Sequence, residues 1–441
     1  MTTPPGGSGR RGSWRQWATA LAWGASIAAL ASLLPLGDAF GLASLVAATT
    51  IVAWVAWRNP GVRAPLVVAF ALRSLGALSH VYGVQLPGAG LDAVTFERIG
   101  WEFAQSDWRT LRGSISGGAF LYSWIIAVLY WLTARSPLLI EMVNVLLGTL
   151  VVYEVHVLAG MMWSDADARR AAWVAALFPT MVLYSAITLR EMLVAYPLVL
   201  GAVWLARWRV TGRLRWVVGA MGAFIVGIAF HTMMFGAILF VLGTAAARWM
   251  STVKEGQLRQ SVGILAGLVL AGAAGLYILA SGLGAGNFAY TDVFSSTDLI
   301  AAQQLGTGDR ASYLQGMMIR SFGDLLWQAP IRTFFFLFMP FPWIVSAVID
   351  LVGLIDAALY VVLCVCALRR LRVIWSTPVA RLTALLWASC AVVFGLVVTN
   401  YGTAIRHRGK LAPLLIAVAI VGVPHRPRQR TLTVPASDVV A

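Results

Sequence analysis

The chain has 441 residues, of which 59% are hydrophobic and 12% charged, and its mean hydropathy is +0.79. The charged share is about half that of an ordinary soluble domain, which excludes a soluble globular enzyme. Because apolar runs of membrane-spanning length recur from end to end, the composition predicts an all-α polytopic membrane protein.

The net charge of +15 comes from 31 arginines and two lysines, most of which stand just outside the apolar runs. The positive-inside rule places such clusters in cytoplasmic loops. We therefore interpret the charge as an orientation signal, and we expect no nucleic-acid partner. The clusters lie at residues 10–15, 207–215, 369–372 and 426–430.

The polar start, residues 1–16, predicts a disordered cytoplasmic leader, and the run that follows is too long for a signal-peptide core. We expect one transmembrane domain over residues 17–423, with about 10–13 transmembrane helices, and a basic cytoplasmic tail over residues 424–441. The apolar runs are residues 17–36, 39–57, 64–86, 119–133, 138–163, 171–188, 192–206, 216–230, 233–247, 262–281, 351–368, 379–399 and 411–423.

If successive runs cross the membrane in opposite directions, residues 87–118 and 282–330 are extracytoplasmic loops. We expect these loops to carry short amphipathic helices. If every run crossed, the arginines of residues 207–215 would lie outside, against the positive-inside rule. One run within residues 118–163 must therefore re-enter or lie flat. The short run at residues 333–343 ends in prolines and is interpreted as re-entrant or interfacial.

The first outer loop carries Asp92 just after the third apolar run ends. A carboxylate presented over a cavity at the membrane surface could take a proton from an acceptor hydroxyl. A solvated loop carboxylate is the alternative. Glu97 and the acids that follow it alternate with aromatic residues, a pattern that also describes an amphipathic helix on the outer leaflet.

A second signal is the pair Arg190 and Glu191 between two apolar runs. Charges at such a position either meet lipid headgroups or point into a polar cavity. Adjacent residues cannot face each other along one helix, so each needs its own partner. Structural pairing is as plausible as a functional role.

The third signal is the cluster Arg406, His407, Arg408 and Lys410, at the end of a run that is predicted to lead outward. Basic residues on the outer face oppose the positive-inside bias, and so call for an anionic partner. Arginine offers bidentate, permanently charged donors that suit phosphate. We predict binding of a lipid-linked phosphate, with ordinary anionic headgroups as the alternative.

Two weaker candidates, Arg73 and His80, stand seven residues apart in the third run. They therefore lie on one helix face and could line the same cavity.

The order of these signals resembles the GT-C superfamily of multi-pass membrane glycosyltransferases, which includes protein O-mannosyltransferases and aminoarabinose transferases. The resemblance rests on Asp92 in the first outer loop and on Tyr122 in the helix that follows. It continues through residues 136–148 and the Ala-rich residues 171–191. Unlike many members, the chain has no second acid next to Asp92 and no soluble C-terminal domain.

The resemblance implies an inverting transfer from a polyprenyl-phosphate-linked sugar to an envelope glycan, lipid or protein acceptor on the outer face of the cell membrane. Asp92 would be the catalytic carboxylate and Glu191 a second acid near the reacting centre. The basic cluster, with Arg190, Glu97, Tyr122, Arg73 and His80, would bind substrate. No metal-ligand spacing is present, and a divalent metal is left open as cofactor.

Two other functions remain open. An envelope polysaccharide polymerase or ligase would use a diphosphate-linked lipid and also needs outer-face arginines. A lipid-sugar transporter or flippase would be expected to show repeated halves, which the chain does not.

Overall fold

The computed structural model describes residues 35–115, 117–238, 240, 241, 243, 244, 311–314, 317, 322–346 and 348–420. The regular elements over these residues are helices, and six of them are long and apolar enough to cross a bilayer. The chain is an all-α polytopic membrane protein, as its composition predicts. The expected leader, most of the second outer loop and the basic tail lie outside the described residues.

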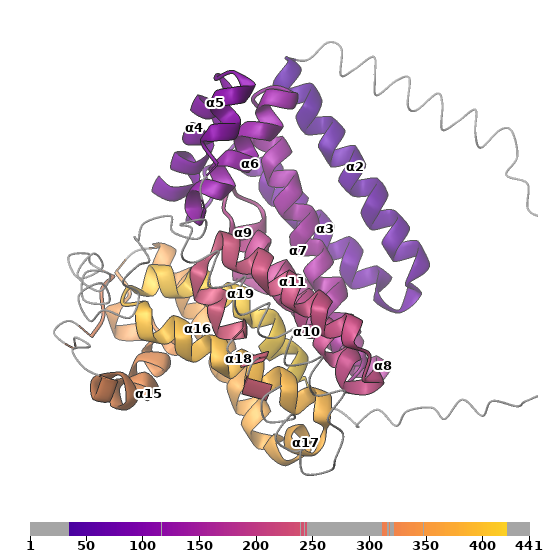
Figure 1. The fold of residues 1–441 in the computed structure, drawn as a ribbon, viewed down its shortest axis with the longest axis vertical. Coiled ribbons are helices and arrows are strands. Elements are labelled where there is room, and N and C mark those ends of the chain that lie inside the picture. The colour runs from indigo at the N-terminus through magenta and orange to yellow at the C-terminus, as the bar shows by residue number, and fades with distance from the viewer. Residues whose placement is uncertain are drawn as a thin grey trace, which may run out of the picture.

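The helices follow one another with short connections from α2 to η2, as Figure 1 shows. In chain order they are α2 (Leu36–Arg58), η1 (Pro60–Val62), α3 (Arg63–Tyr82), α4 (Leu91–Ala104), α5 (Trp108–Gly113), α6 (Ala119–Leu132), α7 (Pro137–Gly160), α8 (Asp165–Leu177), α9 (Pro179–Ser185), α10 (Glu191–Thr211), α11 (Leu214–Phe230), η2 (Thr232–Met234), α15 (Phe322–Phe338), η4 (Pro342–Ile344), α16 (Val348–Arg369), α17 (Leu371–Ser376), α18 (Pro378–Val397) and α19 (Tyr401–Ala419).

Local sequence explains several of the helix ends. The hydroxyl of Ser136 accepts a hydrogen bond from the backbone N–H of Leu139, and Pro137 occupies the first turn, where its missing N–H costs nothing. Gly212, with φ of 68°, ends α10 in the left-handed conformation that glycine tolerates. Asn400 begins α19 by accepting hydrogen bonds from the N–H groups of Gly402 and Thr403.

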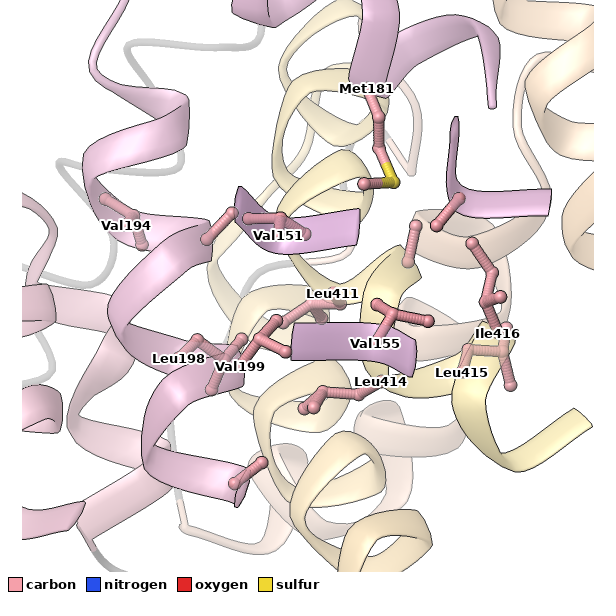
Figure 2. Packing of buried hydrophobic residues seen from close by; sticks show 14 of the residues in the cluster. Val151, Val155, Met181, Val194, Leu198, Val199, Leu411, Leu414, Leu415 and Ile416 are labelled. Carbon is pink, nitrogen blue, oxygen red and sulfur yellow. The ribbon is translucent and has the colours of Figure 1, made fainter. Parts of the chain in front are cut away.

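The core lies where α7, α10 and α19 meet, and α19 is buried along most of its length. Figure 2 shows Val155 of α7 beside Leu414 of α19, with Leu198 and Val199 of α10 next to them. The helices α2 and α3 pack on α7 at the edge of this core and expose more of their side chains. The central helices therefore hold polar residues away from lipid.

The helices α4, α5 and α6 gather at one end of the molecule (Figure 1). The indole N–H of Trp124 in α6 donates to the carbonyl of Leu111 in α5 at 2.8 Å. With 14 residues, α6 is about 21 Å long and too short to span a bilayer upright. Of the two helices within residues 118–163, α6 is the shorter, and α7 is the one long enough to cross a bilayer.

Three boundaries differ from those expected. The run at residues 171–188 is divided into α8 and α9, because Pro179 supplies no N–H to continue the first helix. Residues 333–338 of the short run at 333–343 are the end of α15, which begins at Phe322 inside the expected outer loop, and η4 follows at residues 342–344. The basic cluster and the last apolar run form the single helix α19, so the cluster is not a loop.

Candidate functional site

The site is centred on Arg406, one turn into α19, whose guanidinium bridges two carboxylates from distant parts of the chain. Its Nε and Nη2 donate to Oε1 of Glu191 at 3.1 and 2.9 Å. Its Nη1 forms an ion pair with Oδ2 of Asp92. The three residues that the charge pattern selected therefore meet in one place.

Helix N-termini present both carboxylates to this arginine. Asp92 lies in the first turn of α4, and Glu191 is the first residue of α10. The partial positive charge of a helix N-terminus stabilises an acidic side chain there. Asp92 was expected in a loop, and its place in a helix fixes its direction toward α19.

Burial increases steeply across the site. The side chain of Asp92 is 56% exposed, that of Arg406 19%, and that of Glu191 only 1%. One oxygen of Glu191, Oε2, is buried and accepts no hydrogen bond in the described part of the chain. The site thus opens at Asp92 and closes at Glu191, whose carboxylate keeps one oxygen without a hydrogen bond in the described part of the chain.

Lys410 lies below the arginine, one turn further along α19, with its ammonium 3.7 Å from Oε1 of Glu191. The side chain is completely buried. The helix α19 is not among the six candidate spans. Burial lowers the pKa of Lys410 to about 7, and the nearby Glu191 opposes this shift. A group that titrates near neutral pH therefore lies in the floor of the site.

Two histidines continue from the lysine into the protein. Nζ of Lys410 is 2.9 Å from Nδ1 of His407, and Nε2 of His407 is 3.2 Å from Nε2 of His231. Burial, with the nearby cations as a second cause, lowers the pKa of both histidines well below the ordinary value. Both imidazoles are neutral at neutral pH.

Arg190, which precedes α10, lies at the edge of the same cluster. Its Nη1 donates to the carbonyl of Phe230 at 2.8 Å, and its charge contributes to lowering the pKa of Lys410. Phe230 also lines an apolar groove of about 570 Å³ between α7, α10 and α11, together with Leu193, Tyr196, Val226 and others. An apolar groove thus approaches a cluster of cations.

Comparison with known proteins gave one structural match. No family model matches the chain, and no curated protein does. The crystal structure of ArnT from Cupriavidus metallidurans bound to undecaprenyl phosphate is similar to this chain. The match has a TM-score of 0.46 and 14% sequence identity, and covers 82% of this chain. The chain spans about 60% of the length of that structure.

Arg408, expected to bind substrate with its neighbours, is instead placed on a different face of α19. Its side chain is fully buried in an ion pair with Asp356 of α16, Nε to Oδ2, at 2.7 Å. Its other nitrogens donate to backbone carbonyls, including that of Leu337 at 2.9 Å. The guanidinium of Arg408 therefore joins helices within the protein.

Glu97 and Tyr122 also have partners outside the Arg406 cluster. Glu97 receives two hydrogen bonds from Arg135, at 2.9 and 2.8 Å, and one from the hydroxyl of Tyr130. The hydroxyl of Tyr122 accepts from Nδ2 of Asn144, which also donates to the carbonyls of residues 187 and 189 just before α10. These contacts tie α4, α6 and α7 around the site.

Arg73 and His80 share a face of α3, as their spacing predicts, but they have separate partners. Arg73 donates to the carbonyls of Ala175 and Ala176 at the end of α8, where a cation complements the helix dipole. His80 lies 3.6 Å from Glu141 of α7. The structure thus does not bring them to Arg406.

The sequence analysis missed His231 and Asp356 as partners of the basic cluster. Asp356 stands inside an apolar run, where an acid is costly and needs a partner, so its position was itself a signal. His231 stands at a turn between two short runs, and nothing local distinguishes it from an interfacial histidine.

The described residues of the site do not suit a divalent metal. The described part of the chain holds no group of three His, Cys, Asp or Glu side chains suited to a metal ion. Arg406 and Lys410 already supply cationic charge to both site carboxylates. We therefore derive no step through a metal.

Proposed function

We propose that the protein is an integral membrane glycosyltransferase that transfers a sugar from a polyprenyl-phosphate donor to an acceptor of the cell envelope on the outer face. The observation that carries the proposal is the bridge from Asp92 through Arg406 to Glu191. It combines an accessible carboxylate, a partly exposed guanidinium and a buried open acceptor, which are the groups that transfer from a lipid phosphate requires.

In the proposed reaction, Asp92 accepts the proton of the acceptor hydroxyl as that oxygen attacks the anomeric carbon. The bond between this carbon and the phosphate oxygen breaks, and the phosphate leaves with the electron pair. Attack from the face opposite the phosphate inverts the anomeric carbon. Arg406 stabilises the charge on the leaving phosphate.

The same arginine couples donor binding to the base. In the structure, Arg406 is shared between Asp92 and Glu191, and a phosphate would compete with Asp92 for the Nη1 donor. Glu191 holds the guanidinium from the buried side and keeps it oriented. Its Oε2 is then free to accept a hydrogen bond from a sugar hydroxyl.

The apolar groove that Phe230 helps to line suits a prenyl chain. It lies among membrane helices and is lined by apolar side chains, and Arg190 donates a hydrogen bond to the backbone carbonyl of Phe230. A chain in the groove would bring its phosphate toward the cations of the site. This arrangement favours a single-chain lipid donor.

The test is sugar transfer by membranes that contain the protein, supplied with a panel of radiolabelled polyprenyl-phosphate sugars. We expect Asp92→Asn to abolish transfer while the variant still binds the donor, because the amide cannot accept the hydroxyl proton. Glu102→Gln is the matched control, since Glu102 is an exposed acid of the same helix that pairs with Arg98. Full activity of Asp92→Asn would remove Asp92 from the mechanism.

The same membranes discriminate between the alternatives. A polymerase or ligase would transfer from a diphosphate-linked oligosaccharide and not from a monophosphate sugar. A flippase would move the labelled lipid between leaflets without forming a product.

A further inference from the structure

The proposed function uses Arg406, Glu191 and Asp92, but a buried chain of hydrogen bonds continues behind them. It runs from Lys410 to His407 and then to His231, at 2.9 and 3.2 Å. Each histidine is only 9% exposed and Lys410 is not exposed at all. Three polar side chains buried in an apolar core carry a desolvation cost, which their mutual hydrogen bonds must offset.

The lysine determines which atom donates and which accepts in these hydrogen bonds. A protonated amine only donates, so Nδ1 of His407 must accept. The proton of the neutral His407 ring then lies on Nε2 and is donated to Nε2 of His231. The proton of His231 is left on Nδ1, which is buried and has no hydrogen-bond partner in the described part of the chain.

We propose that His231 is a positioning residue: by fixing the tautomer of His407, it holds Lys410 protonated beside Glu191 and sets the pH range over which the site binds a phosphate. The inference rests on the proposed function, because it assigns the pH dependence of the same site. His231 acts through His407 and need not touch the ligand.

The surroundings of Lys410 show why the histidine matters. Glu191 of α10 favours the charged amine, whereas Arg190 and Arg406 oppose it. From α18 the ring of Phe394 lies 5.9 Å from Nζ and supplies no hydrogen-bond acceptor of ordinary strength. Two acids of α16 contact α19: Asp356 is paired with Arg408, and Asp350 accepts a hydrogen bond from the hydroxyl of Tyr401 at 3.2 Å.

His407 is thus the acceptor that supports Glu191 in keeping the amine charged. Because burial lowers the pKa of Lys410 to about 7, a modest change in this support alters its charge within an accessible pH range.

The experiment measures binding of a polyprenyl monophosphate to the purified full chain in nanodiscs between about pH 5.5 and 9. For the unmodified protein we expect binding to weaken as pH rises and Lys410 loses its proton. His231→Leu removes the acceptor of the His407 Nε2 proton. The tautomer that carries the proton on Nδ1 then competes, and it offers Lys410 no acceptor. We expect the midpoint of the decline to move down by about 0.5 to 1 pH unit.

His231→Gln should restore the original midpoint, because its side-chain oxygen can accept from Nε2 of His407. His231→Asn, whose amide is one carbon shorter, should not. His156→Leu is the control for loss of a partly buried histidine elsewhere and should leave the midpoint unchanged. If His231→Leu does not fold, the comparison of the glutamine and asparagine variants decides.

The outcomes separate the two proposals. Absence of binding by the unmodified protein at every pH would overturn the proposed function. Binding with the same midpoint in His231→Leu, or in both the glutamine and asparagine variants, would overturn the inference alone. The chain has only five histidines, so ¹⁵N NMR can assign their tautomers directly. We expect the proton on Nε2 of His407 and on Nδ1 of His231, and the reverse assignment would also overturn the inference.

Discussion

Arg406 is the residue on which the site depends, because it alone contacts both site carboxylates through different nitrogens. We expect Arg406→Lys to raise the KM for a polyprenyl-phosphate donor at least about tenfold, which corresponds to a loss of about 1.4 kcal/mol of binding free energy. Lysine keeps the charge but cannot hold two carboxylates in a fixed geometry. Steady-state kinetics on detergent-solubilised protein would measure the change.

The control for this substitution is Arg98→Lys, because Arg98 is an exposed arginine that pairs with Glu102 along one helix. Exposed pairs contribute less than about 1 kcal/mol, so its KM should remain near that of the unmodified protein. Equal KM values for both variants would show that Arg406 does not bind the donor phosphate.

At the residue scale, the sequence led to Asp92, Glu191 and Arg406 because charges are rare in the chain and each one needs a reason. The same logic failed for Arg408, whose partner Asp356 stands 52 positions away in an apolar run. Four basic residues in five positions look equivalent in a sequence. On a helix they point in different directions, and only the packing of α19 decides which one reaches the site.

At the element scale, the ion pair of Asp356 and Arg408 joins α16 to α19, and Thr180 of α9 donates to the same carboxylate at 2.6 Å. We expect Asp356→Leu to destabilise the protein by about 3 to 5 kcal/mol, because it leaves a buried guanidinium without its counter-charge. Thermal unfolding in detergent can be followed with a thiol-reactive fluorophore, for which the buried Cys390 is a natural reporter.

The double variant Asp356→Leu with Arg408→Met is the control for this prediction. It removes both charges together, and apolar replacements of a buried pair are often neutral or stabilising. The double variant should therefore unfold at a higher temperature than Asp356→Leu alone. A double variant as unstable as the single one would mean that the pair is not what joins the two helices.

Elements were easier to predict than their ends. Long apolar runs gave the six candidate spans to within a few residues, because length and hydropathy alone determine them. The division of the run at residues 171–188 depended on one proline, and the start of α19 depended on the Asn400 cap. Tertiary contacts decide such points, since residues 311–313 pair with residues 399–401 and fix where α19 starts.

At the scale of the whole molecule, the two ends of α10 indicate how the protein is oriented in the membrane. Its 21 residues are about 31 Å long, enough to cross the hydrocarbon core. Glu191 lies at one end with Asp92 and Arg406, and the arginines of residues 207–215 lie at the other. The positive-inside rule predicts that the arginine end faces the cytoplasm, and the proposed function then requires the candidate site to face outside.

Cysteine labelling tests this orientation in a background from which Cys364, Cys366 and Cys390 have been removed. Glu102→Cys on α4 and Arg213→Cys beyond α10 both place a thiol at an exposed position, near opposite ends of the molecule. In right-side-out vesicles we expect a membrane-impermeant maleimide to label the first variant at once and the second only after permeabilisation. The reverse pattern would put Asp92 and Arg406 in the cytoplasm, where the proposed outer-face transfer could not occur.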